Sequence, residues 1–396
     1  MKAIVLLVLM ASMLPFTRAS AQLHKDLPKV LTSNAVVGER ERPRSQWQGS
    51  GDSWSRAARN NILLYENDIG SSDRSYTNGI SYQTERLYVP RWLEHRLHQK
   101  AISTCGLLSM QPCAFTSLGL SQTMFTPESL SVVVLQPRSR PYAGLLLATA
   151  GLRIMWPSSL ISFNLDGGVG GPPALARETQ SLAHWAWSTG AVRPRGWDNQ
   201  LRFTPHLQTN TQLTHTLLSS QDGRAAEGGR APSFSTDLRV SGEASMGTIN
   251  GRASLGGAVR VGYRMPAWGG SMRIMPTGRG ATRSATVRAI RSFFEELNRD
   301  AWIFAFGSAT GRAIGWNHTL EGVPLIDGGP KGWREQGSIR IERGVTELSY
   351  GVSAGTNTFG LAFQRIVRSK EFDTGAEHRF INLGVYLFGT QVARGR

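Results

Sequence analysis

The 396-residue sequence has few cysteines, few charged residues and no long apolar run. Its two cysteines, Cys105 and Cys113, cannot build a disulfide scaffold or a four-cysteine zinc site. No stretch of about 18 or more apolar residues occurs, which excludes a helical membrane protein. Charged residues make up 18 % against 40 % hydrophobics with 11 Trp, which is too apolar and aromatic for a disordered chain. A soluble nucleic-acid-binding protein and a β-barrel both survive these exclusions.

The N-terminus has the pattern of an export signal. Lys2 opens a basic region, residues 4–16 form an apolar run, and Ala19-Ser20-Ala21 offers small residues for cleavage. We therefore expect a signal peptide over 1–21, followed by a polar, mobile leader over 22–58. An exported chain has little nucleic acid to bind, so its net charge of +16 fits phosphate-bearing lipid head groups better. Outside the cell the two cysteines could close a small disulfide loop or stay as free thiols.

Most of the remaining chain alternates apolar and polar residues with a period of two. The segment 237–246 places Leu238 and Val240 on one face and Asp237 and Arg239 on the other. Side chains of a strand point alternately to opposite faces, so each such segment has one apolar and one polar face. A water-soluble sandwich shows the same alternation, so the pattern alone leaves both architectures open.

Three features favour an outer-membrane barrel. The segments run about ten residues or more, their polar faces carry repeated Arg, Glu and Asp, and the last segment ends in the aromatic stretch 385–388. The fold class predicted is all-β: a transmembrane antiparallel up-and-down β-barrel over 59–388, with a tail over 389–396. About twelve strands are expected, an even number being usual for closed barrels. They are placed at 60–67, 77–87, 115–123, 142–155, 159–168, 201–216, 234–247, 253–266, 299–311, 334–352, 355–368 and 378–388.

Two helices are expected between the strands. Pro172-Pro173 can start a helix that covers 174–187, and Gly190 and Pro194 end it. Within it Gln180 and His184 are four residues apart and share a face. The stretch 283–297 has apolar residues at helical spacing and suggests a second, short helix.

Three polar clusters fall between these elements. Glu66-Asn67-Asp68 with the segment 73–79 gathers oxygen ligands that suit calcium, although spacing alone favours a polar hairpin turn with Asn-Gly. The arginines of 138–144 could grip a phosphate or belong to a solvated loop. The third cluster joins the helix of His184 to 196–201, where a lone helical histidine is often structural. In an up-and-down barrel all three clusters lie at the same end, which indicates one site with a metal, a base and anion-binding arginines.

Other motifs do not fit their context. The segment 351–355 matches the nucleophile-elbow pattern, but the sequence after it continues like a strand and not a helix, so we expect a Gly-rich hairpin. No HExxH, CxxC or Walker phosphate loop is present. The other histidines have no ligand-like companions nearby in the sequence and are expected to be structural or exposed; they are His206, His215, His318 and His378.

At the three clusters the sequence resembles the outer-membrane lipid A 3′-O-deacylases. The matching stretches run in order from about 60 to 388. They are 66–68, 73–79, 118–119, 125–127, 142–144, 170–172, Gln180 with His184, 196–201, 320–322 and 368–372. One departure is Ser139, which stands directly before Arg140 where the family pattern has an acidic residue.

The resemblance implies a twelve-stranded barrel whose active site lies near the outer rim, between the wall and a short loop helix. It implies calcium-assisted ester hydrolysis that removes the 3′-linked acyloxyacyl group of lipid A. The pKa of an ordinary imidazole is about 6.5, so the imidazole can take a proton from water at neutral pH. A calcium ion would stabilise the oxyanion that forms at the ester carbonyl. The roles implied are His184, Asn67 and Gln180 as catalytic residues, Arg140 as substrate contact, and Asp68 and Thr77 as metal ligands.

The partners expected are therefore lipid A or lipopolysaccharide and the outer membrane's lipids, with no nucleic acid and with the protein a monomer. Two other functions stay open from the sequence: a non-catalytic outer-membrane pore, and a lipid esterase that uses a Ser–His pair.

Overall fold

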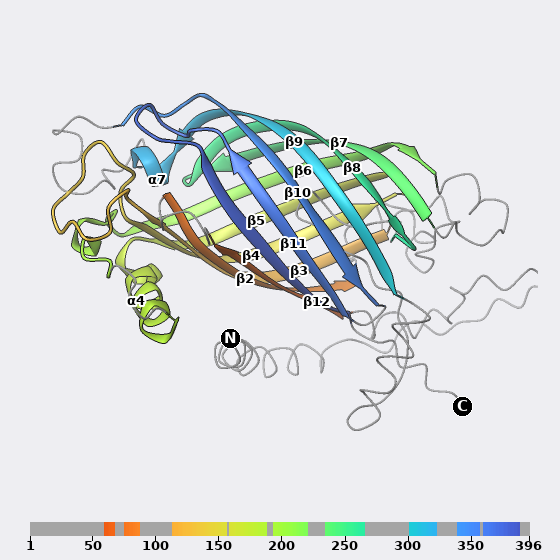
Figure 1. Cartoon of the computed structure of the whole chain (residues 1–396), viewed down its shortest axis with the longest axis horizontal. Coiled ribbons are helices and arrows are strands. Elements are labelled where there is room, and N and C mark those ends of the chain that lie inside the picture. The colour runs from red at the N-terminus through yellow and green to blue at the C-terminus, as the bar shows by residue number, and fades with distance from the viewer. Residues whose placement is uncertain are drawn as a thin grey trace, which may run out of the picture. The chain divides into compact units, whose positions relative to one another are not determined.

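Twelve antiparallel strands close into a barrel in the computed structural model of the chain (Figure 1). The structure describes residues 59–67, 75–87, 113–156, 158–187, 193–220, 234–265, 301–322, 339–356 and 359–388, all within the compact unit 49–396. None of the helices in these ranges is long and apolar enough to cross a membrane. The strands are β1 Arg59–Asn67, β2 Ser75–Leu87, β3 Cys113–Thr126, β4 Ala143–Met155, β5 Ser159–Gly170, β6 Thr204–Ser219, β7 Phe234–Gly247, β8 Asn250–Tyr263, β9 Trp302–Asn317, β10 Gly344–Gly355, β11 Phe359–Arg368 and β12 His378–Phe388.

Each strand pairs with its neighbours in sequence, and the first strand closes the ring against the last. In that closing pair Leu63 of β1 lies opposite Val385 of β12. The predicted number of strands and the up-and-down order are confirmed. Full closure leaves no sheet edge in the barrel, which is what a bilayer demands of strands that cross it.

One predicted strand starts too early. The alternation suggested a strand from residue 334, but β10 begins at Gly344. Residues 339–343 form a loop in which the Arg343 carbonyl accepts from the backbone of Ile314 on β9, and which makes an isolated bridge, Ile341 with Phe372, to the β11–β12 connection. Both side chains are buried in a small apolar cluster, so the alternation there comes from loop packing and not from the wall.

The predicted loop helix exists but begins later than expected. Pro172–Ala174 form a 3-10 turn, η2, and the α-helix α4 covers Ala176–Trp187. Between them Leu175 has a left-handed backbone with φ of 55°, which ends the 3-10 turn and lets the chain start again as an α-helix. The proline pair therefore starts the short turn and not α4.

The outer surface is apolar, and the lumen carries charged residues together with an apolar cluster around Phe304. Asp237 and Arg239 on β7 are buried in the lumen, where they form an ion pair, whereas the alternating Leu238 and Val240 are 38 % and 40 % exposed. The same alternation runs around the wall, so the apolar side of the strands faces outward, as lipid requires.

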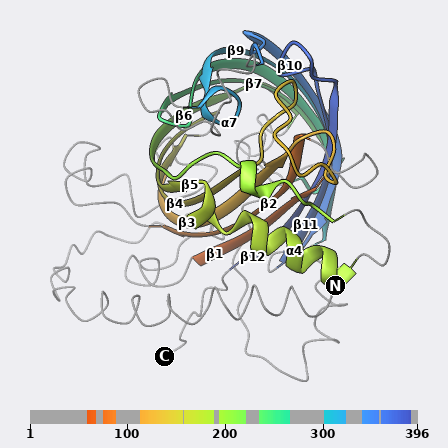
Figure 2. The same ribbon diagram turned by 90° about the vertical axis from the view of Figure 1, so that its left-hand side faces the viewer.

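The connections from odd to even strands all lie at one end of the barrel, which we call the outer end. Figure 1 shows α4 and the one-turn helix α7, His318–Glu321, at this end. Seen from that end, α4 lies outside the ring of strands and α7 lies over its mouth (Figure 2).

Several expectations fall on residues outside the described ranges. These are the signal peptide 1–21, the leader 22–58, the tail 389–396, the helix 283–297 and Cys105. The segment 351–355 is described: it ends β10, and a short connection leads to β11 without a helix. The nucleophile-elbow reading is therefore excluded.

Candidate functional site

Helix α4 packs against the lipid-facing surface of the wall and not over the lumen. On β3, Phe125 points into the lumen towards Ile366 and Phe380, so its neighbour Met124 points outward. Met124 is buried against Ala176, the first residue of α4. The outward side of the wall at its outer end is thus covered by α4.

A glycine makes this close contact possible. Gly144 of β4 lies opposite Met124 in the sheet, and a Cβ atom at this position would come within 2.5 Å of the Cβ of Ala176. Beside it, the side-chain nitrogen of Gln122 donates to the carbonyl oxygen of Ala174 at 2.6 Å. A small residue and one hydrogen bond therefore hold the start of the helix on the wall.

Two aromatic residues hold the middle of α4. Trp197 is 2 % exposed, and its indole Nε1 donates to Oε1 of Gln180 at 2.8 Å. Its ring lies 4.7 Å from the ring of Tyr142, whose carbonyl oxygen accepts from the backbone of Leu201. The turn η3, Trp197–Asn199, thereby connects the helix to the loop between β3 and β4.

Gln180 and His184 lie one turn apart on α4, as the sequence predicted. The Gln180 side chain is 2 % exposed, and the His184 side chain is half-buried. The structure therefore places the predicted base on the helix whose first residue, Ala176, packs on the outward surface of the wall.

The metal-binding candidates lie at the same end of the barrel. Asn67 ends β1 and pairs in register with Asn78 of β2, which in turn pairs with Met124. Thr77 falls in a bulge of β2, where the register skips between Tyr76 and Asn78. Strands are about 4.8 Å apart, so this row brings Asn67 within roughly 14 Å of the Gly144 position under α4. Asp68 lies outside the described residues.

Asn78 is an outward polar residue that the sequence did not single out. Its side-chain nitrogen donates to the hydroxyl of Tyr65 at 3.1 Å. Tyr65 faces outward because its neighbour Glu66 faces the lumen, where it accepts from Asn382 at 3.2 Å. The outer end of β1–β2 thus presents polar groups on a surface that is elsewhere apolar.

The donor chemistry of the predicted calcium ligands fits the ion. A carboxylate, an amide and a hydroxyl are the hard oxygen donors that calcium takes. The described ranges contain no group of three or more His, Cys, Asp or Glu that could hold a metal. Asp68 lies outside these ranges, and calcium stays a prediction.

Arg140 ties three outer-end loops together. Its Nη1 donates to Oε2 of Glu371 at 2.9 Å and its Nη2 donates to Oγ1 of Thr319 at 3.0 Å. Its guanidinium lies 4.3 Å over the ring of Phe125, and the residue is only 1 % exposed. The loops that follow β3, β9 and β11 therefore meet at this side chain. Substrate contact by Arg140 stays a prediction, because the structure shows it engaged by the protein.

The acidic partner of Arg140 comes from far along the sequence. Ser139, directly before Arg140, is not acidic, and the carboxylate partner of Arg140 is Glu371, between β11 and β12. Burial raises the pKa of Glu371, but the charges of Arg140 and Arg368 outweigh it and hold the pKa at about 2. Glu371 is thus an anion held by two cations.

An ion-pair chain continues from this point into the lumen. Arg368 contacts Glu371 at 3.3 Å and Glu347 at 2.8 Å, and Arg312 grips Glu347 with two nitrogens at 2.8 Å each. Because both carboxylates accept from two arginines, the network fills the mouth of the lumen with paired charges.

Helix α7 closes the mouth above this network. Asn317 caps it by accepting from the Thr319 backbone, and Glu321 accepts in return from the Asn317 backbone. His318 is 1 % exposed, and its ring lies 4.5 Å from the ring of His206 on β6. Burial, together with His206, lowers the pKa of His318 to about 3, so it is neutral. The sequence analysis expected both histidines to be structural or exposed, and they are buried and pack on each other.

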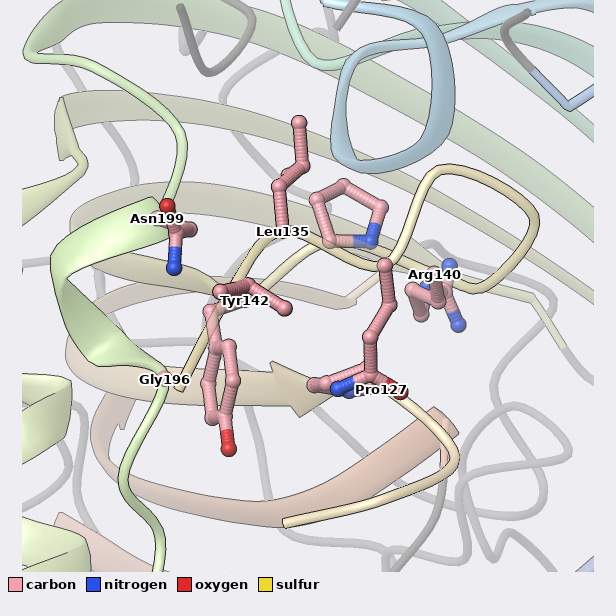
Figure 3. A pocket seen from close by; sticks show the side chains of 9 residues that line it. Pro127, Leu135, Arg140, Tyr142, Gly196 and Asn199 are labelled. Atoms are coloured by element: carbon pink, nitrogen blue, oxygen red, sulfur yellow. The ribbon is translucent and has the colours of Figure 1, made fainter. Parts of the chain in front are cut away.

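A small cleft opens beside the covered wall. It has an empty volume of about 200 Å³ and lies between the β3–β4 loop and η3 (Figure 3). Tyr142 and Arg140 line it from the loop, and Gly196 and Asn199 line it from the other side. Neither Gln180 nor His184 is among the lining residues, so the cleft adjoins the candidate catalytic face without forming it.

A Ser–His contact lies at the other end of the barrel. Ser159 and His215 are cross-strand neighbours on β5 and β6, with Oγ and Nδ1 2.8 Å apart in an exposed position. No acidic side chain is seen to orient this histidine in the part of the chain that the structure describes. The contact gives the Ser–His alternative little support.

The contacts that organise the site were not visible in the sequence. Trp197 and Glu371 lie in stretches that match the family, yet only the fold brings them to Gln180 and Arg140. The partners are 17 and 231 residues apart in the chain. The only signal was that these residues stand in matching stretches at the same end of the barrel.

Comparison with known proteins gives one strong likeness. The family described as outer membrane protein LpxR matches residues 28–387. Among solved structures, LpxR from Salmonella typhimurium has a TM-score of 0.60 at 15 % identity, over 83 % of this chain and 99 % of that chain. The β domain of the Bordetella autotransporter BrkA has a TM-score of 0.37 at 6 % identity, over 84 % and 98 %. No curated protein matches the sequence. The structural likeness to the Salmonella protein is one of fold, and the autotransporter score is too low to carry an argument.

Replacing Arg140 by Ala should lower the free energy of unfolding by up to about 3–5 kcal/mol, because Glu371 then keeps only Arg368 as a cation. Urea unfolding in detergent, followed by tryptophan fluorescence, measures it. The matched control is Arg177→Ala, which breaks the exposed ion pair with Asp198 and should cost less than about 1 kcal/mol. Equal effects of the two substitutions would contradict the role given to Arg140.

Acid should lower the free energy of unfolding in two steps, through His318 and then through Glu371. The pKa of His318 is about 3 in the fold and about 6.5 when unfolded, so the unfolded chain binds the extra proton and stability falls as pH drops below 6.5. Glu371 stabilises the fold fully above its ordinary pKa of about 4.3, and this contribution is lost as pH falls towards 2.

The step at higher pH tests the contribution of His318 separately from that of Glu371. Unfolding free energies between pH 6.5 and 4.5 should show a slope that His318→Phe reduces by up to about 1.4 kcal/mol per pH unit. His215→Phe, at an exposed position, should leave the slope unchanged. An unaltered slope in His318→Phe would show that this histidine is not held neutral.

Proposed function

Because the chain belongs to the LpxR family of outer membrane proteins, we propose that it is a lipid A 3′-O-deacylase. It would hydrolyse the ester that holds the 3′-linked acyloxyacyl group. The outer membrane location follows from the family and the barrel. The reaction and the roles of its residues are the proposal.

The observation that carries the proposal is the position of α4 on the outward surface of the wall. Ala176 packs on Gly144 and Met124, outside the lumen. A substrate that reaches His184 along this surface comes sideways from the lipid layer, not through the barrel. That geometry suits a membrane lipid whose ester lies at the head-group level.

The lumen argues against the alternative of an open pore. At its outer mouth, over which α7 lies, ion pairs join Arg140 to Arg312 through Glu371 and Glu347. Deeper down, Asp237 contacts Arg239 and Arg260 on the lumenal side of the wall. Conducting pores have a water-filled interior, whereas here the Arg140–Glu371 pair joins two loops over the mouth.

The proposed reaction needs a base and a donor from this chain. His184 takes a proton from a water molecule, whose oxygen attacks the ester carbonyl carbon and forms a tetrahedral oxyanion. When the oxyanion collapses, the bond to the sugar oxygen breaks and His184 returns the proton to that oxygen. The products are a free acyloxyacyl acid and a sugar hydroxyl, and no Ser or Cys nucleophile is required.

Asp68 and Thr77 would hold a calcium ion by their oxygen atoms, beside the catalytic residue Asn67. Such an ion would supply positive charge near the ester carbonyl oxygen. Arg140 acts on the proposed substrate through the loop that it anchors, and its direct contact with a phosphate stays a prediction.

Replacing His184 by Ala should reduce deacylation at least about 100-fold, because the general base is lost while the wall is untouched. Mass spectrometry of lipid A from cells that produce each variant measures it, and heat-modifiable mobility on gels confirms the barrel. The wild type should remove one 3′-linked acyloxyacyl unit.

The matched control is His215→Ala, which removes a histidine at the opposite end of the barrel. It should keep wild-type activity. If His215→Ala were inactive and His184→Ala active, the Ser–His alternative would replace the present proposal.

Chelation by EDTA should abolish deacylation by the purified protein, and added calcium should restore it. Asp68→Ala should raise the calcium concentration needed for half-maximal activity at least about tenfold, since outer-shell changes alone cost that much at metal sites. Asp198→Ala removes an exposed carboxylate near α4 and should leave the requirement unchanged. Full activity in EDTA would rule out the metal.

A further inference from the structure

We infer that Trp197 is a positioning residue for the proposed reaction: its indole sets the orientation of the Gln180 amide so that the amide nitrogen is offered to an oxygen of the ester. The inference rests on the proposed function and adds a residue to it. It starts from the buried hydrogen bond between the two side chains.

The chemistry of the indole fixes which end of the amide it contacts. An indole nitrogen can only donate a hydrogen bond, so its partner must be the amide oxygen. The two side chains are each 2 % exposed, and Trp197 Nε1 lies 2.8 Å from Gln180 Oε1. The assignment of the amide oxygen and nitrogen therefore follows from a donor that has no alternative role.

This orientation turns the amide nitrogen away from Trp197. Nε2 of Gln180 is buried and has no hydrogen-bond partner among the residues that the structure describes. A buried donor without a partner is unfavourable, so an acceptor supplied at this position would be bound favourably. Two N–H groups that point away from a fixed oxygen can serve an oxygen acceptor, which an ester carbonyl and its oxyanion both supply.

The surroundings of Trp197 keep its ring from moving. The ring lies against Tyr142, and a Cβ atom at Gly196 would come within 2.7 Å of the tyrosine ring. Met124 and Ala176 belong to the same buried cluster. The barrel wall thus fixes the orientation of the Gln180 amide through the packed rings of Tyr142 and Trp197.

Without the indole donor the amide would lose its preferred orientation. The oxygen and nitrogen of a glutamine amide have nearly the same shape, so Gln180 could turn its oxygen towards the substrate as easily as its nitrogen. An oxygen there would repel the oxyanion. Because this repulsion grows as charge develops, kcat should suffer more than KM.

Trp197→Phe is the decisive variant, since it keeps an aromatic ring but removes the donor. We expect kcat to fall about tenfold or more, with KM within about twofold of the wild type. The matched control is Trp302→Phe. Trp302 is also buried, and its Nε1 donates to the carbonyl oxygen of Thr356 at 3.1 Å at the other end of the barrel. Trp302→Phe should leave kcat and KM unchanged.

A second measurement reports the contact independently of activity. In protein labelled with ¹⁵N-tryptophan, the Trp197 indole resonance is assigned by its absence from Trp197→Phe. Gln180→Ala should shift this resonance and leave that of Trp302 in place. If the Trp197 indole resonance did not shift in Gln180→Ala, the contact would be absent and the inference would be wrong.

The two measurements separate the possible failures. An active wild type whose kcat survives Trp197→Phe would overturn the positioning role, even with the contact present. A wild type that releases no acyl group contradicts the proposed deacylase function and with it the catalytic role of Trp197, while the resonance shift still decides whether the indole orients Gln180.

Discussion

The packing of Ala176 on Gly144 is the contact from which the proposed site follows. It places α4 on the lipid-facing side of the barrel, and a side chain larger than hydrogen at Gly144 would push the helix away. The proposed catalytic roles of Gln180 and His184 on α4 depend on this placement. Gln180 and His184 on a helix over the lumen would face water and ion pairs, whereas here they lie where a lipid can approach from the membrane.

The outer end of the barrel therefore has two separate tasks, and one loop serves both. Arg140, near the end of the β3–β4 loop, is buried with Glu371 and Thr319 and closes the mouth. Tyr142, two residues later, packs on Trp197 outside the wall. The closed lumen and the covered outer surface are thus parts of one structure, in which the charged contacts face inward and the aromatic contacts face outward.

The fold could be predicted from the sequence because it depends on local periodicity. Alternation such as that at 237–246 predicts a strand, and twelve such strands that pair in sequence order leave few topologies. The strand predicted from 334 was too long because loop residues such as Ile341 are buried in a separate apolar cluster. Alternation cannot distinguish that burial from burial in a wall.

The candidate site could be predicted only in part. The spacing of Gln180 and His184 on a helix is local and was visible. The partners that orient or neutralise the neighbouring side chains come from distant connections, as Glu371 does for Arg140 and Trp197 does for Gln180. Whether α4 covers the lumen or the lipid-facing surface depends on the direction in which Gly144 and Met124 point, and that requires the register of the whole barrel.

The central claim is that the catalytic face of α4 meets the lipid layer. It is tested most directly by placing a photoreactive amino acid at Ser181, an exposed position on α4, and irradiating intact cells. The account predicts a covalent adduct with lipopolysaccharide at this position and none for the same probe at the lumenal position Thr310 of β9. An adduct at Thr310 without one at Ser181 would contradict it.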